Sequence, residues 1–353
     1  MAYLFICSTG DHAGQSLIAC AVALRLLEKG IRPGFFKPFG TGLVHINDLW
    51  TDPDAHLFKE LLNIQEPLEM ICPYLISDKL ETRHGPIEIL EKIKSIIHEL
   101  SKGKDTILIA GSKHIFFDDA PYSLPDISII SELNADLVLA HRYRQVSTTL
   151  YSILSIHSLL KDRVKGVIIN RVPADQINDI KGQVMPVLNQ KGILNICVLP
   201  EDPFLSLKSI EEIREILGGK IICGDEYLGR PVGGMTVGTE GLNKELMLFK
   251  RVYNKIILLE PSTTSRKIAG ILLTGNREPP YQVLEAARRS KIPLILVKED
   301  SFVSQERLEG NVAAISPGDR KKILHFMNMM DGDDSLNRMI QSMGIVSETI
   351  QVV

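Results

Sequence analysis

Nine residues near the start of the chain have the spacing of a phosphate-binding loop whose usual lysine is missing. The segment 8–16, Ser-Thr-Gly-Asp-His-Ala-Gly-Gln-Ser, follows an apolar run at 3–7 and precedes a helical pattern at 17–29. In such loops the backbone N–H groups at a helix N-terminus hold phosphate, and the lysine adds a point charge. Neutral Gln15 stands in that place here. The loop is therefore suited to binding an anion but poorly equipped for phosphoryl transfer, in which charge neutralisation dominates catalysis. We expect the anion to contact Thr9, Gly10, His12, Gly14, Gln15 and Ser16.

Polar and basic residues also follow other apolar runs of the first half. Lys37 follows the second run, Arg142 and Arg144 follow the fourth, and Asn170 ends the fifth. Open parallel sheets bind ligands at the carboxyl ends of their strands, so we expect these side chains to join the loop in an anion or nucleotide site. Arginine binds phosphate or carboxylate through paired hydrogen bonds, and an asparagine amide suits a purine edge. The alternatives are a surface lysine, a solvated basic turn or subunit contact, and a turn asparagine. Lone histidines are mostly structural, which leaves that alternative for His12.

The elements that must position these residues alternate along the chain. Expected strands cover 3–7, 33–36, 106–110, 136–140, 166–170 and 193–199, and expected helices cover 17–29, 54–62, 87–102, 148–160 and 175–191. Continuous apolar strands between helices predict a parallel sheet covered on both faces.

A turn-rich segment with Pro200 and Pro203 predicts a domain boundary near residue 203. A second alternation follows, with strands at 220–223, 235–237, 255–259, 270–274 and 293–297 and helices at 209–217, 243–248, 280–290 and 304–309. We expect a first domain at 1–203, a smaller α/β domain at 204–330 and a tail at 331–353. The tail is interpreted as a final helix or a dimer arm.

Composition excludes several function classes. The chain has 353 residues, 44% of them hydrophobic, and a net charge of −3, which gives no electrostatic drive toward nucleic acid or anionic lipid. No apolar run is long enough to span a membrane. The five cysteines form no CxxC pair, so we expect reduced core residues in a cytoplasmic protein. His114 with Asp118 and Asp119 has only weak metal-site spacing, and we predict no permanent metal there.

Several of these motifs occur in the order of a known family. The loop 8–16, Phe36-Lys37-Pro38, Asp54-Ala55, Pro73-Tyr74 and the run Gly-Val-Ile-Ile-Asn-Arg at 166–171 resemble dethiobiotin synthetase-like P-loop proteins. Cobyrinic acid a,c-diamide synthases belong to the same group. Over residues 1–203 the chain is most similar to the dethiobiotin-synthetase-like N-terminal region of long bacterial phosphate acetyltransferases.

This resemblance implies a P-loop NTPase-like fold and a role for several residues. In the family, the loop lysine and a glutamate after the third strand hold ATP and Mg²⁺, and here Ala110 replaces that glutamate. Ser16 and Asp54 keep two oxygen donors for weakly held Mg²⁺. Lys37 would face the substrate and γ-phosphate, and Asn170 would read an adenine edge. Loss of both lysine and glutamate argues against efficient ATP-dependent chemistry.

The second half resembles a DRTGG domain, a small α/β module associated with regulation. The resemblance rests on residues 225–234, Asp-Glu-Tyr-Leu-Gly-Arg-Pro-Val-Gly-Gly, followed by Gly-Ile-Leu-Leu-Thr-Gly at 270–275. Ser265-Arg266 stands where the family has Asp-Arg, which puts any ligand read by that aspartate in doubt. The acetyltransferase catalytic domain would follow beyond Val353, so the resemblance implies no acyl transfer to phosphate.

Three functional hypotheses follow. The first is a non-catalytic or weakly active regulatory protein, expected as a homodimer, that binds ATP or another adenine nucleotide or an anionic metabolite. The second is an ATP-dependent carboxylate ligase in which Lys37, Arg142 or Arg144 replaces the missing lysine while Ser16 and Asp54 hold Mg²⁺. The third is a ligand-free protein that binds another chain, such as an acyl-phosphate enzyme.

Overall fold

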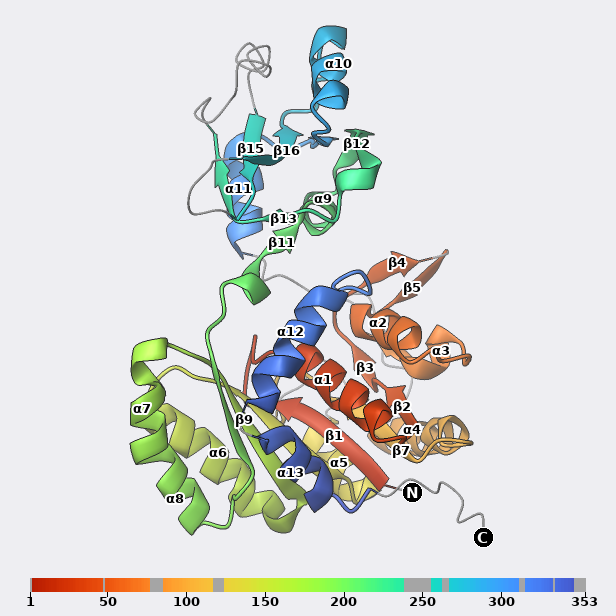
Figure 1. Cartoon of the computed structure of the whole chain (residues 1–353). Coiled ribbons are helices and arrows are strands. Elements are labelled where there is room, and N and C mark those ends of the chain that lie inside the picture. The colour runs from red at the N-terminus through yellow and green to blue at the C-terminus, as the bar shows by residue number, and fades with distance from the viewer. Residues whose placement is uncertain are drawn as a thin grey trace. The chain divides into compact units, whose positions relative to one another are not determined.

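The computed structural model describes residues 2–46, 48–76, 85–116, 124–237, 255–261, 267–310, 315–332 and 334–345. The chain folds into two compact units (Figure 1). The first unit spans Met1–Asp202 and resumes at Ile315, and the second spans Pro203–Ala314. The described residues between 315 and 345 therefore belong to the first unit, whereas the sequence pattern assigns 315–330 to the second domain.

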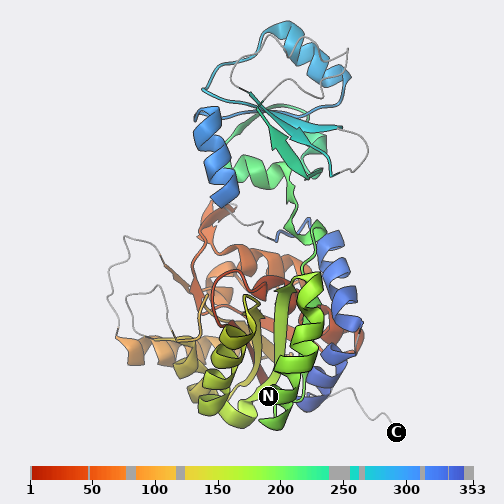
Figure 2. The same ribbon diagram turned by 90° about the vertical axis from the view of Figure 1, so that its left-hand side faces the viewer.

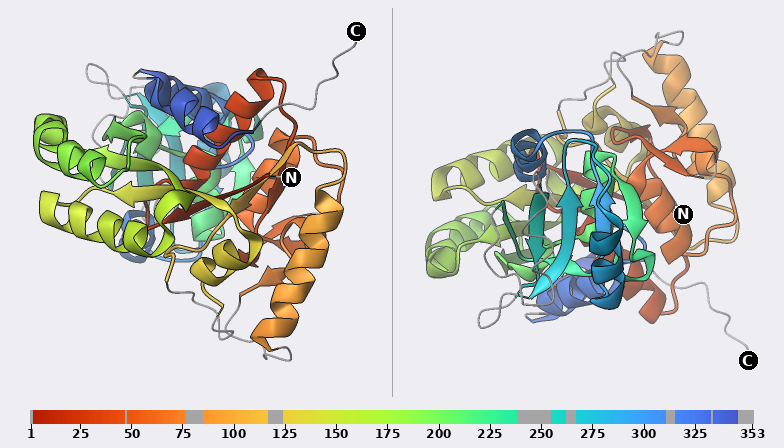
Figure 3. Two further views of the ribbon diagram at one scale, coloured as in Figure 1. Left: turned by 90° about the horizontal axis from the view of Figure 1, so that it is seen from below. Right: turned by 90° about the horizontal axis from the view of Figure 1, so that it is seen from above.

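The first unit is built on a six-stranded sheet in the order β10-β9-β8-β1-β7-β2, with every neighbouring pair parallel. Its strands are β1 (Ala2–Ser8), β2 (Pro33–Phe36), β7 (Thr106–Ala110), β8 (Asp136–Arg142), β9 (Val164–Val172) and β10 (Ile196–Pro200). The predicted parallel sheet is confirmed. The middles of its strands are apolar and buried because helices cover both faces (Figure 3).

Helices from the middle of the chain cover one face of this sheet. Ile89, Ile129 and Ile153 pack with Phe5 and Cys7 in one buried cluster on that face. The contributing helices include α4 (Pro86–Leu100), α5 (Asp126–Leu133) and α6 (Val146–Leu160). The sequence pattern had not predicted α5. The predicted helix at 175–191 is composite, made of η2 (Ala174–Gln176), α7 (Ile177–Asp179), the π-helical turn η3 (Ile180–Val184) and α8 (Met185–Gln190).

The opposite face is covered by α1 (Gln15–Glu28) and by two C-terminal helices, α12 (Arg320–Asp331) and α13 (Ser335–Ser342). Arg25 of α1 forms an ion pair with Asp331. A Cβ atom at Gly166 of β9 would lie 2.6 Å from the sulfur of Met339, so glycine permits α13 to approach the strand. Residues 335–342 are therefore a helix of the first unit rather than a free tail, and a dimeric state stays a prediction.

Short elements fill the segment between β2 and β7. They are β3 (Phe39–Gly40), β4 (Val44–Ile46), β5 (Leu49–Thr51), α2 (Pro53–Leu61), α3 (Leu68–Ile71) and β6 (Tyr74–Leu75). Asp52 caps α2 by accepting a hydrogen bond from the N–H of Asp54, and Pro53 occupies the first helical position. This cap brings two carboxylates to the helix N-terminus.

The second unit has a five-stranded sheet in the order β12-β17-β16-β15-β14, in which only β16 and β17 pair in parallel among the described strands. Its strands are β12 (Lys220–Cys223), β14 (Gly234–Thr236), β15 (Lys255–Leu259), β16 (Ile268–Leu273) and β17 (Leu294–Leu296). Figure 2 shows α9 (Ile210–Leu217) and α11 (Ser301–Gly310) on one face and α10 (Tyr281–Arg289) on the other. The predicted helix at 243–248 and Ser265-Arg266 lie outside the described residues.

The cysteines and the helix lengths test two expectations drawn from the composition. All five cysteines are unpaired and buried, as predicted for core residues. Within the described ranges, every helix is too short or too polar to cross a membrane.

Candidate functional site

The loop between β1 and α1 depends on glycine at the helix N-terminus. Gly14 is the N-cap of α1 with φ 86°, and its carbonyl accepts a hydrogen bond from Ile18 at 3.0 Å. A Cβ atom there would lie 2.4 Å from Nδ2 of Asn170. Positive φ and this close approach both favour glycine. No acidic residue occupies the first turn of α1, so the helix N-terminus keeps its attraction for an anion.

Asn170 anchors the loop to the end of β9. Its amide nitrogen donates to the carbonyl of Ala13 at 2.9 Å, and its side-chain oxygen accepts from the N–H of Arg171 at 2.8 Å. The residue is 5% exposed. The observed role of Asn170 is to position the loop backbone, and its contact with an adenine edge stays a prediction.

Gln15 points back toward the sheet. Its amide nitrogen donates to the carbonyl of Ile6, at the end of β1, at 2.5 Å and to the carbonyl of Gly111, after β7, at 3.0 Å. Both hydrogens of the amide are therefore engaged by backbone acceptors. The residue in the place of the lysine ties two strand ends together and supplies no positive charge.

The segment after β7 runs along the loop. The hydroxyl of Ser8 hydrogen-bonds to the carbonyl of Lys113 at 2.5 Å, and Thr9 pairs with His114 in an antiparallel bridge. The N–H of Ile115 donates to the carbonyl of Ser8 at 3.1 Å. These contacts fix the first residues of the phosphate loop, the part that contains the predicted anion contacts Thr9 and Gly10.

Asp126 is a buried carboxylate that sequence reasoning missed. It is 1% exposed and accepts the N–H of Ser112 at 2.7 Å. A Cβ atom at Gly111 would lie 2.1 Å from its oxygen, so the carboxylate fills the space beside the end of β7. Its only sequence signal was an acidic residue directly after Pro125, which is a common start for a helix.

Lys37, Asp52 and Asp54 form a buried ionic cluster next to α1. Nζ of Lys37 lies 2.5 Å from Oδ2 of Asp54 and 2.9 Å from Oδ1 of Asp52. Burial alone would lower the pKa of Lys37, but the two carboxylates outweigh it and raise that pKa. Burial acts to raise the pKa of Asp54, yet Lys37 and the Ser16 hydroxyl hold it below its ordinary value. Ser16 and Asp54, the predicted Mg²⁺ ligands, are therefore in contact with each other.

Asp52 is held by the backbone as well as by Lys37. Its Oδ2 accepts the N–H groups of Thr41 at 3.0 Å and Gly42 at 3.3 Å. Burial nevertheless raises the pKa of this carboxylate. Sequence reasoning missed Asp52, although an acidic residue directly before a proline at a helix start is a recognisable cap signal.

His141 connects the loop to α6. Its Nδ1 lies 2.7 Å from the hydroxyl of Thr9, and its Nε2 lies 3.0 Å from the hydroxyl of Thr149. Burial, with a smaller contribution from Arg144, lowers the pKa of His141 to about 4. The imidazole is therefore neutral at pH 7, and it donates to one threonine and accepts from the other.

Arginine side chains gather at the ends of β8 and β9. Arg142 pairs with Asn170 in the register of these strands, which places it on the same face of the sheet as the loop anchor. Arg171 follows directly with φ 56°, and burial together with Arg142 lowers its pKa. Within the described part of the chain, Arg142, Arg144 and Arg171 form no ion pair. Sequence reasoning had not selected Arg171, although it belongs to the 166–171 motif.

Two models of known protein families match successive parts of this chain. Residues 2–209 match the model of an AAA domain, and residues 212–310 match that of a DRTGG domain. The first match covers more than half of the chain. The chain belongs to this AAA domain family. The predicted combination of a dethiobiotin synthetase-like P-loop domain and a DRTGG domain is confirmed.

Relatives with curated names agree with this assignment. A phosphate acetyltransferase from Synechocystis sp. is 24% identical over 97% of this chain and 52% of its own length. An ATP-dependent dethiobiotin synthetase from Clostridium acetobutylicum is 26% identical over 53% of this chain and 87% of its own length. The chain thus spans about half the length of the phosphate acetyltransferases it matches. MinD from Aquifex aeolicus is 16% identical over 58% of this chain and 84% of its own, with a TM-score of 0.35.

The AAA domain holds no ready cluster of metal ligands in the described ranges, where no group of three or more His, Cys, Asp or Glu side chains has the arrangement to hold a metal ion. His114 lies beside the loop, and burial lowers its pKa. Asp118 and Asp119 lie outside the described residues.

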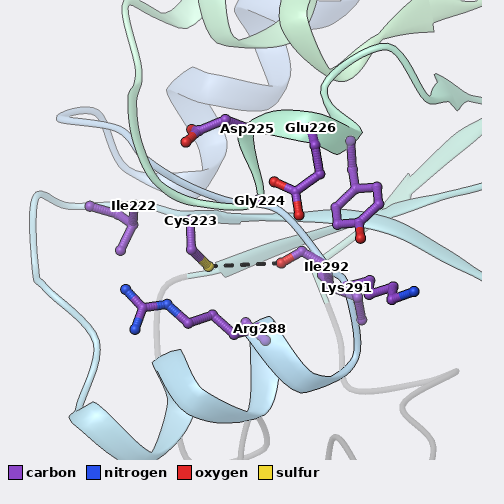
Figure 4. A pocket seen from close by; sticks show the side chains of 10 residues that line it. Ile222, Cys223, Gly224, Asp225, Glu226, Arg288, Lys291 and Ile292 are labelled. Atoms are coloured by element: carbon purple, nitrogen blue, oxygen red, sulfur yellow. Dashed lines mark hydrogen bonds between the residues drawn. The ribbon is translucent and has the colours of Figure 1, made fainter.

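The DRTGG domain contains a separate pocket of about 280 Å³ between the end of β12 and the end of α10. Figure 4 shows Asp225 and Glu226 on one side of it, Arg288 and Lys291 on the other, and the Cys223 sulfur between them. All four charged residues are exposed. Burial raises the pKa of the Cys223 thiol, so the thiol is protonated at neutral pH.

Proposed function

We propose that this chain binds a phosphorylated anionic ligand, with an adenine nucleotide as the first candidate, and acts as a regulatory rather than a catalytic protein. The observation that carries the proposal is the set of three guanidinium groups, Arg142, Arg144 and Arg171, at the strand ends beside the phosphate loop. Guanidinium groups without carboxylate partners bind phosphate through paired hydrogen bonds. The relationship to ATP-dependent dethiobiotin synthetases supports an adenine nucleotide.

The non-catalytic part of the proposal rests on the residues around the loop. Gln15 is neutral and engaged by two backbone carbonyls. Ala110 ends β7, and the Asp126 carboxylate beside that strand end is bound to the backbone N–H of Ser112. Phosphoryl transfer depends on cations and metal ligands at these positions. One form of the ligase alternative uses Lys37 in place of the missing loop lysine, and the buried pairing of Lys37 with two carboxylates argues against that form.

Calorimetric titration of ATP with and without Mg²⁺ tests the proposal. We expect saturable binding and no continuing heat. Continuing heat with Mg²⁺ would mean turnover and would favour the ligase, whereas the absence of any heat would favour the ligand-free partner protein. ADP and AMP are the next ligands to titrate.

Arginine variants locate the binding site. Replacing Arg142 and Arg171 with glutamine should weaken binding at least tenfold, because each charge-assisted hydrogen bond contributes about 1.5–3 kcal/mol. Arg163, in the short turn η1 (Lys161–Arg163), lies at the amino end of β9, away from the carboxyl ends of the strands, and is the matched control. Equal weakening by Arg163→Gln would mean that only overall charge matters.

A further inference from the structure

Asp54, one of the two side chains expected to hold Mg²⁺ beside the loop, is already bound to an ammonium group. The Ser16 hydroxyl lies near enough to the Asp54 carboxylate to help lower its pKa, and Lys37 Nζ lies 2.5 Å from that carboxylate. The position of a third ligand at the end of β7 holds Ala110, and the Asp126 carboxylate beside it accepts the N–H of Ser112 at 2.7 Å. Mg²⁺ requires a near-octahedral shell of oxygens at about 2.0–2.1 Å. An ammonium nitrogen in hydrogen-bond contact with Asp54 leaves no room for that shell, so the residues present do not fit Mg²⁺.

The ammonium group is fixed in this position by burial and charge. The side chain of Lys37 is 9% exposed, and those of Asp52 and Asp54 are 2% and 18% exposed. Removal of one member of a buried ion pair leaves an uncompensated charge, which is strongly unfavourable. Lys37 is therefore held by both carboxylates, and moving its ammonium group toward a ligand would leave them without their cation.

The backbone around the cluster reinforces this arrangement. The N–H of Lys37 donates to the carbonyl of Ile71 at 2.8 Å, which fixes the start of the side chain. Asp52 accepts the N–H groups of Thr41, Gly42 and Asp54, so its carboxylate is oriented independently of Lys37. The cluster is preorganised around one positive charge at the place between the two carboxylates.

We propose that Lys37 is a built-in counter-ion that occupies the place of Mg²⁺, so that the loop takes up its phosphorylated ligand without a divalent cation. The ligand part of this inference rests on the proposed function, whereas the cation part does not. The positive charge on the ligand side then comes from the arginines at the ends of β8 and β9.

Manganese binding measured by electron paramagnetic resonance tests the cation part without any nucleotide. The wild type should show no Mn²⁺ binding that depends on Asp54, so Asp54→Asn should leave its Mn²⁺ titration unchanged. The double variant Lys37→Met/Asp52→Asn keeps the net charge of the cluster, since it removes one positive and one negative charge, and it should bind about one equivalent. Adding Asp54→Asn should remove that binding. Lys29→Met, at an exposed lysine beyond α1, is the charge-loss control and should behave as the wild type.

Melting temperatures measured with Mg²⁺ and with EDTA give a second test, which still works if Lys37→Met alone folds poorly. A cation that binds only the folded state stabilises it by mass action. We expect Mg²⁺ to raise the melting temperature of Lys37→Met by several degrees relative to EDTA and to leave the wild type unchanged. Wild-type Mn²⁺ binding that depends on Asp54, or Lys37 variants that neither bind Mn²⁺ nor gain stability from Mg²⁺, would overturn the inference.

Nucleotide titration separates the two parts. If ATP binds, its dissociation constant should agree within about twofold in EDTA and in Mg²⁺, and tenfold tighter binding with Mg²⁺ would contradict the counter-ion role. If ATP, ADP and AMP all fail to bind, the proposed function fails while the manganese result still decides the role of Lys37.

Discussion

The phosphate loop of the AAA domain and the pocket of the DRTGG domain begin with the same local geometry. Each has a strand, then a glycine with left-handed backbone, Gly14 with φ 86° or Gly224 with φ 88°, and then a helical turn. Gly14 opens a 14-residue helix without acidic residues in its first turn. Gly224 opens the three-residue turn η5 (Asp225–Tyr227), which starts with two acidic residues. The helix N-terminus after Gly14 therefore attracts an anion, whereas the acidic side chains of the turn after Gly224 repel one.

The two regions also differ in how their charges are balanced. Lys37 and its carboxylates are buried and paired, while Arg288 and Lys291 are exposed at the rim of the pocket, where Arg288 forms an exposed ion pair with Glu285 at 3.5 Å. Buried ions need fixed partners, whereas exposed ions are stabilised by water and stay available to a ligand. The buried charge cluster of the first region therefore maintains structure, whereas the exposed charges of the second region are solvated and contribute little to stability.

The largest expected effect is the loss of stability when the buried cation Lys37 is removed, compared with removal of the exposed Lys291. Lys37→Met should lower the free energy of unfolding by about 3–5 kcal/mol, because it leaves buried carboxylates without their cation. Lys291→Met, at an exposed lysine, should change it by less than about 0.5 kcal/mol. Urea denaturation of both variants measures the difference. Similar losses at the two sites would break the distinction between structural and available charge.

The paired glycines give the next effect. Alanine at either position should cost about 1–2 kcal/mol for the left-handed backbone. Gly224→Ala should cost about 1–3 kcal/mol more, since its Cβ would lie 2.7 Å from the backbone Cα of Pro293, whereas Gly14→Ala meets the amide of the Asn170 side chain rather than backbone. Thermal melts rank the two, and only Gly14→Ala should weaken ATP binding. A larger loss at Gly14 would contradict the packing argument.

The acid sensitivity of the loop gives a smaller effect. Folded His141 stays neutral down to its pKa of about 4, whereas the unfolded chain binds the proton near pH 6.5. The unfolded state thus binds more protons between these values, so the free energy of unfolding falls as pH falls from 6.5 to 4, by about 2–3 kcal/mol. His141→Gln should flatten this limb when denaturation is compared at pH 7 and pH 4.5. Parallel pH profiles for variant and wild type would exclude the role of His141.

The smallest effect tests whether the loop retains an ATP pocket. Gln15→Lys restores the missing positive charge and should raise ATP affinity about tenfold, or about 1.4 kcal/mol. The lysine must leave the carbonyls of Ile6 and Gly111, which limits the gain. Calorimetry with a circular dichroism spectrum as the folding control measures it. Unchanged affinity in a folded variant would count against an intact ATP pocket.

Local patterns in the sequence determined the architecture of both domains. The apolar runs at 33–36 and 106–110 coincide with β2 and β7, and the strand–loop–helix order placed the phosphate loop at the carboxyl end of β1. These features depend on neighbours along the chain, because hydrophobic period and glycine position act over a few residues. The sequence by itself also revealed the family, since its motifs keep their order.

Only the tertiary structure decided what the candidate residues contact. The partners of Gln15 are carbonyls of two different strands, and α12 reaches α1 across some 300 positions of sequence, as the Arg25–Asp331 pair shows. Lys37 had been expected at a ligand, yet the cap of α2 brings Asp52 and Asp54 to its ammonium group. Residue types show which charges exist, but only the folded chain shows which are buried together, and burial decides whether a charge needs a partner within the protein.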